Sequence, residues 1–221
     1  MTLPTRTPAI MGILNVTPDS FYDGGRYGSV NAAVGQALMM LKEGADSIDI
    51  GGESTGPGSR EIRVEEEVRR VIPVIKGVRC QVSGVRLSVD TYKMEVARQA
   101  LEAGATMVND VTAGRGDSAM FPLIAKTGCR YVMMHAKDPT ARTTTKEVHY
   151  DDVVQTIHQF FEERLAAAEH AGIKRGQIIL DPGLGHFISS DPKYSWEILE
   201  RLEKLSDLGC PILVSPSRKS F

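Results

Sequence analysis

The sequence predicts an α/β protein in which short parallel strands alternate with helices along one chain. Seven short apolar runs each end at a polar residue, and stretches of helical length with one apolar face separate them. Alternating units of this kind build a parallel sheet covered by helices. In such folds the functional site forms at the carboxyl ends of the strands, so the polar residues that end the runs are expected to converge on one pocket.

The predicted strands follow one another at regular intervals. They cover residues 9–15, 47–51, 85–90, 106–110, 130–134, 177–181 and 211–215. A closed barrel of such units has eight strands and typically ~250 residues, whereas this chain of 221 residues ends soon after the seventh strand. An unpaired parallel edge would leave backbone N–H and C=O groups without partners beside the site. We therefore expect the natural chain to be longer, with a final helix–strand–helix segment missing here.

The intervening helices are predicted from apolar residues at helical spacing. The spacing is carried by Val34, Ala37, Leu38 and Leu41, then by Val64, Val68, Val71, Ile72 and Ile75, and later by Val153, Ile157, Phe160, Phe161 and Leu165. Pro73 is expected to kink the second of these helices without ending it, because the apolar period continues beyond it. Further helices contain Leu101, Ile124, Ile198 and Leu202, and the last is expected to begin at Asp191-Pro192.

Composition narrows the class of protein. The 26 basic and 28 acidic residues form no long run of either sign, which argues against a nucleic acid or a membrane surface as partner. No segment reaches the ~20 apolar residues of a membrane span, and residues 1–8 contain no apolar stretch of signal length. The three cysteines lack paired spacing, which argues against a disulfide framework and a zinc site. A single cytoplasmic domain over residues 1–221 is the prediction.

Two loops carry groups suited to an anionic ligand. The segment Asn15–Phe21 after the first strand contains Ser20 and other oxygen donors that could ligate Mg²⁺ and contact phosphate, although an ordinary capped turn would look similar. The segment Gly51–Gly58 after the second strand contains four glycines. These allow close approach of the backbone to a ligand, and loop flexibility alone is the alternative.

Three further strands end in Asp90, Asn109 and Asp181. A buried carboxylate is costly unless it is paired, and the amidine-like edge of a ligand, with its parallel N–H groups, would supply such a partner. Asn109 adds one donor and one acceptor beside it. Each residue alone could simply cap its strand, but three at one rim favour a ligand site.

The remaining polar groups are less informative. The segment Ser217–Ser220 follows the seventh strand, where barrels of this kind often bind an anion, although a solvated basic turn is the alternative. Met133 and Met134 suit core packing, and His135 is interpreted as a structural histidine. The polar tract 137–146 is predicted to be a mobile surface loop.

At these residues the chain resembles the dihydropteroate synthase family of pterin-binding enzymes. The matching segments are Asn15–Phe21, Gly52–Thr55 with Pro57-Gly58, Ser88–Thr91, Asn109-Asp110, Met134-His135, Asp181–Gly183 and Ser217–Ser220. They occur in the family's order from Gly12 to Phe221. The resemblance implies a TIM (β/α)8 barrel, usually dimeric, with the C-terminal helix–strand–helix absent from this chain.

The resemblance also implies a transferase of folate biosynthesis, a target of sulfonamides. It would condense 6-hydroxymethyl-7,8-dihydropterin pyrophosphate with p-aminobenzoate, by loss of pyrophosphate to leave a cation-like pterin and attack by the amine. The implied catalytic residues are Asp90, Lys219 and Asn15, with Mg²⁺ held by Asn15. The implied pterin-binding residues are Asp90, Asn109, Val111, Met134, Asp181 and Lys219. Those for p-aminobenzoate are Thr55, Pro57 and Ser217, and those for pyrophosphate are Asn15, Ser20 and Thr55.

The chain departs from the family at several positions. Gly56 stands where the family commonly has an arginine that contacts pyrophosphate, and Leu184–Phe187 replaces the usual aromatic and glycine residues. Ser215 replaces a glycine, and the Arg and His of the family's last strand are absent. Two rival interpretations therefore stay open: a pterin-binding paralogue without synthase activity, and a domain that passes a methyl group from methyltetrahydrofolate to a corrinoid.

Overall fold

The computed structural model describes residues 7–17, 26–217, 219 and 221, with side chains from Val30 onward in the first helix. Its strands are β1 (Met11–Asn15), β2 (Ser47–Gly51), β3 (Arg86–Asp90), β4 (Met107–Asp110), β5 (Arg130–Met134) and β6 (Ile178–Asp181). The helices are α1 (Arg26–Lys42), α2 (Val64–Gln81), α3 (Met94–Glu102), α4 (Met120–Thr127), α5 (Val153–His170) and α6 (Lys193–Glu200). Short 3-10 turns are η1 (Arg175–Gln177), η2 (Gly185–Phe187) and η3 (Leu202–Leu208).

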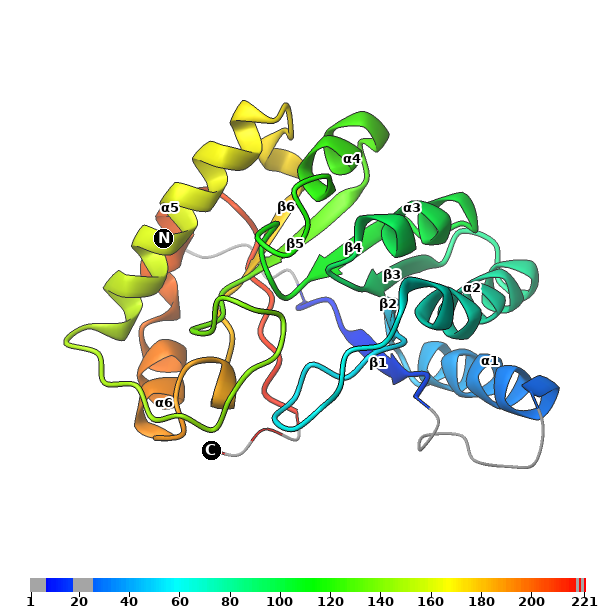
Figure 1. Ribbon diagram of the computed structural model, residues 1–221, viewed down its shortest axis with the longest axis horizontal. Helices are drawn as coiled ribbons and strands as arrows, with labels where there is room; N and C mark the ends of the chain where they lie inside the picture. The colour runs from blue at the N-terminus through cyan, green and yellow to red at the C-terminus, as the bar shows by residue number, and fades with distance from the viewer. Residues whose placement is uncertain (1–6, 18–25, 218, 220) are drawn as a thin grey trace.

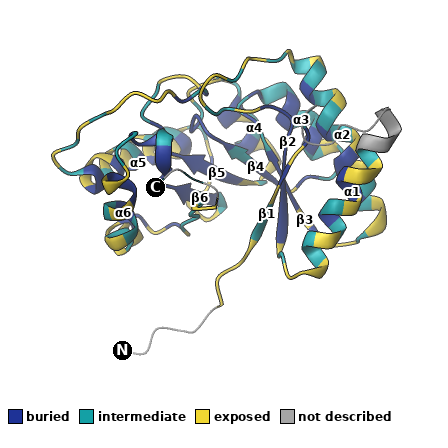
Figure 2. Ribbon diagram, turned by 90° about the horizontal axis from the view of Figure 1, so that it is seen from below, coloured by how far each residue is buried: buried dark blue, intermediate teal, exposed yellow. Residues whose placement is uncertain are grey.

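The strands form one parallel sheet in sequence order, β1 to β6. Figure 1 shows the helices arranged in an arc around the outside of the strands, as repeated βα units require. Figure 2 shows buried strands at the centre and exposed residues on the outward faces of the helices. The predicted alternating architecture is confirmed, and the strand boundaries agree with the prediction to within two residues.

The prediction of a full seventh strand is wrong. Between residues 211 and 215 the structure has a single parallel bridge, Ile212 to Leu180 of β6. Leu180 N–H donates to Pro211 O at 2.9 Å and Leu213 N–H donates to Leu180 O at 2.8 Å, so the parallel pattern begins but does not extend. Pro211 and Pro216 have no N–H to donate, and no described strand lies on the other side of this segment. Within the described residues the sheet is thus open between β1 and Ile212.

The helices pack on the sheet through the apolar faces that the sequence predicts. Helix α2 continues through Pro73 and buries Val71, Val74, Ile75 and Val78. Helix α6 begins after Pro192, and the Asp191 carboxylate accepts from Lys193 N–H at 3.0 Å. Leu202, predicted to belong to this last helix, lies instead in the separate turn η3.

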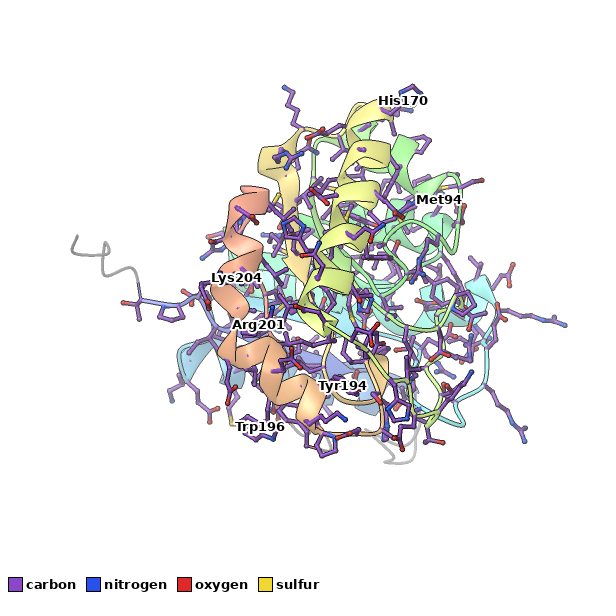
Figure 3. All side chains as sticks on the ribbon, turned by 90° about the vertical axis from the view of Figure 1, so that its left-hand side faces the viewer. Met94, His170, Tyr194, Trp196, Arg201 and Lys204 are labelled. Carbon is purple, nitrogen blue, oxygen red and sulfur yellow. The ribbon has the colours of Figure 1, made fainter. Side chains whose placement is uncertain are left out.

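The last helical segments lie alongside α5. Figure 3 shows α6 and η3 running beside α5, with Arg201 between them and Trp196 on the outer side. The Arg201 guanidinium donates to Asp152, the N-cap of α5, at 2.8 Å. No described helix is both long and apolar enough to cross a membrane.

Candidate active site

A cavity of about 610 Å³ lies at the carboxyl ends of the strands. Most of the predicted site residues line it. These are Asn15, Thr55, Asp90, Asn109, Val111, Met134, Asp181, Ser217 and Lys219. The structure thus brings together side chains that are separated by up to 204 positions along the chain (Asn15 to Lys219, 219 − 15).

Strand register explains how three of these site residues meet. Asn15 pairs with Gly51, Gly51 with Asp90, and Asp90 with Asn109, so these residues near the carboxyl ends of β1 to β4 form one row. A Cβ built on Gly51 would lie 3.4 Å from Asp90 Oδ2 and 3.5 Å from Asn15 Oδ1. The glycine therefore leaves a gap in the row across which two side-chain oxygens face one another.

Asp181 is the last residue of β6, and its buried carboxylate can still accept hydrogen bonds from a ligand. Oδ1 accepts from Gly183 N–H at 2.8 Å and Oδ2 accepts from Ser215 Oγ at 3.3 Å. Burial raises the pKa of Asp181 to about 6, against the opposing effects of the Gly183 N–H and the nearby Lys219. Two carboxylate oxygens have about four acceptor positions. Room for further donors therefore remains on this carboxylate.

Among the described residues, Lys219 is the cation that acts on the carboxylates of Asp90 and Asp181. Burial raises the pKa of Asp90 well above its usual value, and the negative charge of Asp49 adds to the shift, whereas Lys219 opposes it. Burial lowers the pKa of Lys219 itself, while Asp181 and Asp90 oppose that change. The lysine Nζ also lies 4.7 Å from the centre of the Phe187 ring. The Lys219 ammonium group thus interacts with the carboxylates of Asp90 and Asp181 and with the Phe187 ring.

The cavity has an apolar side suited to a flat ring. Val111 and Met134 belong to a small buried cluster with Ala136, Ala141 and Phe187, separate from the main core. Phe187 lies in the segment where the chain departs from the family pattern, so an aromatic wall is present there.

Asp49 is a site residue that the sequence analysis did not select. It lies on β2 between Ile48 and Ile50, which are fully buried, and its own side chain lines the cavity. Asn109 Nδ2 donates to Asp49 Oδ2 at 2.8 Å. Burial raises the pKa of Asp49, and the polar side chains of Ser88 and Asn109 oppose the shift. Asp49 could have been found from the sequence, because it is a single aspartate between two isoleucines in a predicted strand.

Asp110 shows the contrasting structural case. Its carboxylate accepts from Thr112 N–H and Oγ1, from Gly114 N–H and from Tyr131 OH, at 2.6 to 2.9 Å. Burial raises its pKa, and the hydrogen bonds from Thr112 and Tyr131 offset the effect. This fully satisfied carboxylate shapes the turn after β4 and does not line the cavity.

The loop after β2 places Thr55 at the cavity but turns Pro57 away from it. Ser59 N–H donates to Gly56 O at 3.2 Å, which closes a turn whose centre is Pro57 and Gly58. Gly58 has a φ of +77°, as the second central position of such a turn requires. Pro57 is exposed and does not line the cavity. The predicted contact of Pro57 with p-aminobenzoate is therefore not supported by this geometry.

The same loop is anchored by buried ions. Glu53 forms ion pairs with Lys93 and with Arg142, and Lys93 Nζ also lies 2.7 Å from Glu67 of α2. Lys93 Nζ further donates to Ile62 O at 2.8 Å. Two carboxylates and two cations thus join four segments of the chain.

The polar tract 137–146 is not the loosely attached surface loop that we predicted. Lys137 and Thr143 have buried side chains, and Lys137 Nζ donates to Thr143 Oγ1 at 3.0 Å and to Thr144 O at 2.7 Å. Thr143 N–H donates to Thr55 O at 3.1 Å. The tract folds back against the site because its lysine, threonines and aspartate satisfy one another.

His135 and Gly183 support the floor of the cavity. His135 packs edge-on against Phe160 at 4.9 Å, and burial lowers its pKa to about 3, so it is neutral. Gly183 has a φ of +71°, and a Cβ there would collide with the His135 carbonyl oxygen. This agrees with a structural histidine, and Gly183 lets the chain after β6 pass close to it.

Two parts of the predicted anion site lie outside the described residues: Ser20 with the rest of segment 18–25, and Arg218 with Ser220. The described side chains contain no group of three or more His, Cys, Asp or Glu placed to hold a metal. The oxygens of Asn15 and Asp90 beside Gly51 are of the type that Mg²⁺ prefers, and Mg²⁺ is commonly held by one or two protein ligands together with substrate phosphates.

A parallel βα sheet with a polar cavity at its carboxyl edge defines a small-molecule enzyme of the barrel class. The family model described as "Pterin binding enzyme" matches residues 11–221, so the chain belongs to that family. Among its relatives within that family are the dihydropteroate synthases.

The sequence is 41% identical over 212 residues to a dihydropteroate synthase of Synechocystis, covering 96% of this chain and 72% of the relative. It is 46% identical over 213 residues to a probable bifunctional folylpolyglutamate synthase/dihydropteroate synthase of Haloferax volcanii, covering 96% of this chain and 25% of that protein. The chain thus spans a quarter of one relative and nearly three quarters of the other.

Solved structures agree with this grouping. A Xanthomonas albilineans dihydropteroate synthase with 4-aminobenzoic acid superposes with a TM-score of 0.87 at 46% identity, covering 96% of this chain and 74% of that one. A complex of the enzyme from this organism with 7,8-dihydropteroate gives 0.83 at 44% identity, covering 98% and 75%. The Yersinia pestis enzyme in a sulfonamide drug complex gives 0.86 at 38% identity, covering 99% and 78%.

Proposed function

We propose that this protein is a dihydropteroate synthase that joins 6-hydroxymethyl-7,8-dihydropterin pyrophosphate to p-aminobenzoate. The observation that carries the proposal is the charge balance of the cavity. Asp49 and Asp181 contribute buried carboxylates and Asp90 a half-buried one, and Lys219 is the ammonium group that faces them among the described residues. A cavity with such an excess of acceptors suits a flat ligand with several N–H groups, and the 2-amino and N3–H edge of a pterin is one.

The pterin ring is proposed to lie between the strand ends and the apolar wall. Asp181 accepts from the 2-amino and N3–H groups, and Asn109 and Lys219 contact neighbouring ring atoms. Val111 and Met134 cover a ring face. The relatives crystallised with 4-aminobenzoic acid and 7,8-dihydropteroate support a pocket of this kind.

The chemistry then uses the row formed by β1 to β4. The C–O bond breaks first, and pyrophosphate leaves with the electron pair. The ionised form of Asp90, which the nearby Lys219 favours, would stabilise the positive charge that develops on the pterin methylene group. The amine nitrogen of p-aminobenzoate forms the new C–N bond and loses a proton. Thr55 and Ser217 border the aminobenzoate, and both line the cavity.

Asn15 is proposed to hold Mg²⁺ together with the pyrophosphate of the substrate, and Ser20 and Thr55 to contact that pyrophosphate. When bound, the metal offsets the charge of the leaving group. EDTA should abolish turnover and added Mg²⁺ should restore it, whereas full activity in EDTA would remove the metal from the proposal.

A pyrophosphate-release assay with both substrates tests the function. We expect release only when p-aminobenzoate is present. A corrinoid methyltransferase domain would not respond to p-aminobenzoate, and a pterin binder without catalysis would release nothing. Either outcome would reject the proposal.

We also propose a cytoplasmic homodimer, on the basis of the family resemblance. A light-scattering mass of one chain would contradict the dimer, and recovery of the native protein in a membrane or exported fraction would contradict the location.

A further inference from the structure

The Asn109 amide has two chemically opposite ends, and only one of them has a partner among the described residues. Nδ2 donates to Asp49 Oδ2 at 2.8 Å, whereas Oδ1 is buried and accepts no hydrogen bond. Asn109 lines the cavity. A buried acceptor without a donor is costly, and the cost is recovered when a donor arrives. The oxygen of Asn109 is therefore available to a ligand N–H group.

Asp49 decides which end of the amide is available. An ionised carboxylate accepts hydrogen bonds but cannot donate them, so it can hold only the NH₂ end of Asn109. The Asp49 side chain is 4% exposed and lies in a strand whose flanking residues, Ile48 and Ile50, are fully buried. Its position is thus fixed by the sheet. Its second oxygen, Oδ1, is also buried without a hydrogen bond from the described residues.

We propose that Asp49 is a positioning residue for pterin recognition: its carboxylate holds Nδ2 of Asn109 and thereby presents Oδ1 of Asn109 to a ring N–H group. This inference rests on the proposed function and adds a residue with no assigned role in it. Asp49 acts through Asn109, so the cavity at this point selects a ligand donor and disfavours a ligand acceptor. Without Asp49 the amide could turn over and present its NH₂ end instead.

A double-mutant cycle tests this relation. The affinity for 6-hydroxymethyl-7,8-dihydropterin pyrophosphate is measured by calorimetry in the wild type, Asp49→Leu, Asn109→Ala and the double variant. Leucine is branched at Cγ like aspartate but cannot accept a hydrogen bond. We expect each single change to weaken binding on the order of 10- to 100-fold, as for loss of a buried hydrogen bond. The double variant should bind no more weakly than Asn109→Ala alone.

Additive losses would overturn the proposal, because they would mean that Asp49 acts independently of Asn109. Asp49→Asn supplies a second test. It keeps an acceptor for Nδ2 and should recover part of the affinity that Asp49→Leu loses. If the asparagine variant binds no better than the leucine variant, an accepting role for Asp49 is rejected.

Two further measurements distinguish the proposed positioning role of Asp49 from a merely structural role. Asp49→Leu should raise the KM for the pterin substrate and leave the KM for p-aminobenzoate within about twofold, whereas a general disturbance would raise both and overturn the proposal. Ser47→Ala is the matched control, because Ser47 is buried on the same face of β2 but does not line the cavity. Its pterin affinity should equal that of the wild type, and a loss as large as that of Asp49→Leu would overturn the proposal.

If the wild type binds no pterin, the proposed function fails as well. If the wild type binds pterin and the cycle is additive, only the role of Asp49 fails.

Discussion

At the scale of single residues, two buried aspartates show the difference between a carboxylate used by the fold and one kept for a ligand. Asp110 receives four hydrogen bonds from its own turn and from Tyr131. Asp181 receives two, from Gly183 and Ser215, and faces the cavity. Burial alone therefore does not identify a site residue. A site carboxylate is distinguished by the small number of hydrogen bonds that it accepts from the protein.

Asp181→Asn should remove most of the pterin affinity. The carboxylate can accept both N–H groups of the proposed ligand edge, whereas an amide offers one oxygen and an NH₂ group that would face a donor. A lost charge-assisted pair of hydrogen bonds costs about 3 kcal/mol, on the order of 100-fold in affinity. Calorimetric titration with the pterin pyrophosphate measures it, and an unchanged Kd would remove Asp181 from the site.

The same substitution should change the pH dependence of stability. The pKa of Asp181 is about 6 in the fold, compared with about 3.9 for an unfolded aspartate. The folded state therefore binds the proton more tightly, and the wild type loses stability as pH rises from about 4 to about 6.

Asparagine carries no charge to bury, so Asp181→Asn should gain thermal stability relative to the wild type at pH 7 but not at pH 4. The full effect is up to about 3 kcal/mol. Thermal unfolding at both values, without ligand, measures the difference. A difference that does not depend on pH would show that Asp181 is already charged at no cost.

At the scale of elements, the loop after β2 is held by a buried ion cluster and not by apolar packing. Lys93 lies between Glu53 and Glu67, and all three side chains are at most 9% exposed. Removal of the lysine would leave two carboxylates buried together, with only Arg142 beside Glu53. Breaking a buried ion pair in this way is far more costly than losing a surface pair.

Lys93→Met should destabilise the protein by about 3–5 kcal/mol. Arg98→Met is the matched control, because Arg98 pairs with Glu95 and Glu102 on the exposed face of α3 and should cost less than about 1 kcal/mol. Denaturant unfolding of both variants makes the comparison. Equal losses would mean that the buried cluster contributes no more than a surface pair.

The strands also show how much of the fold could be predicted from the sequence. Strands β2 and β5 were predicted residue for residue, because short runs rich in apolar residues between helical segments are typical of buried parallel strands. The segment 211–215 has the same pattern but forms a single bridge, because pairing depends on a neighbour that local pattern does not reveal. Asp49 was missed for a related reason. Its role follows from the register of β2, β3 and β4, which brings it near Asn109 from 60 positions away.

At the scale of the whole molecule, the cavity collects residues from both edges of the open sheet. Ile10, Met11 and Ile13 contribute from the β1 side, and Leu213 to Ser217 contribute from the far side. Thr55 and Ser217, proposed to border p-aminobenzoate, therefore belong to opposite ends of the fold. The residues proposed for the pterin lie on or just after β3 to β6, with Lys219 further along the chain. We therefore propose that the two substrates occupy adjoining parts of one cavity.

Sulfonamides should compete with p-aminobenzoate and not with the pterin substrate, because they resemble the former and would occupy the region bounded by Thr55 and Ser217. Inhibition kinetics with each substrate varied in turn provide the test. Competition with the pterin substrate alone would reject the assignment of these two residues.

We propose that the cavity at the carboxyl ends of the strands is the pterin site, and a crystal structure of the protein with the pterin pyrophosphate would show whether it is. We expect the 2-amino and N3–H edge of the ring to lie on the Asp181 carboxylate. We also expect Asn109 Oδ1 to lie within hydrogen-bond distance of a ring N–H group, and the ring to lie beside Val111 and Met134. Pterin density elsewhere, or a ring whose donor edge points away from Asp181, would contradict this proposal.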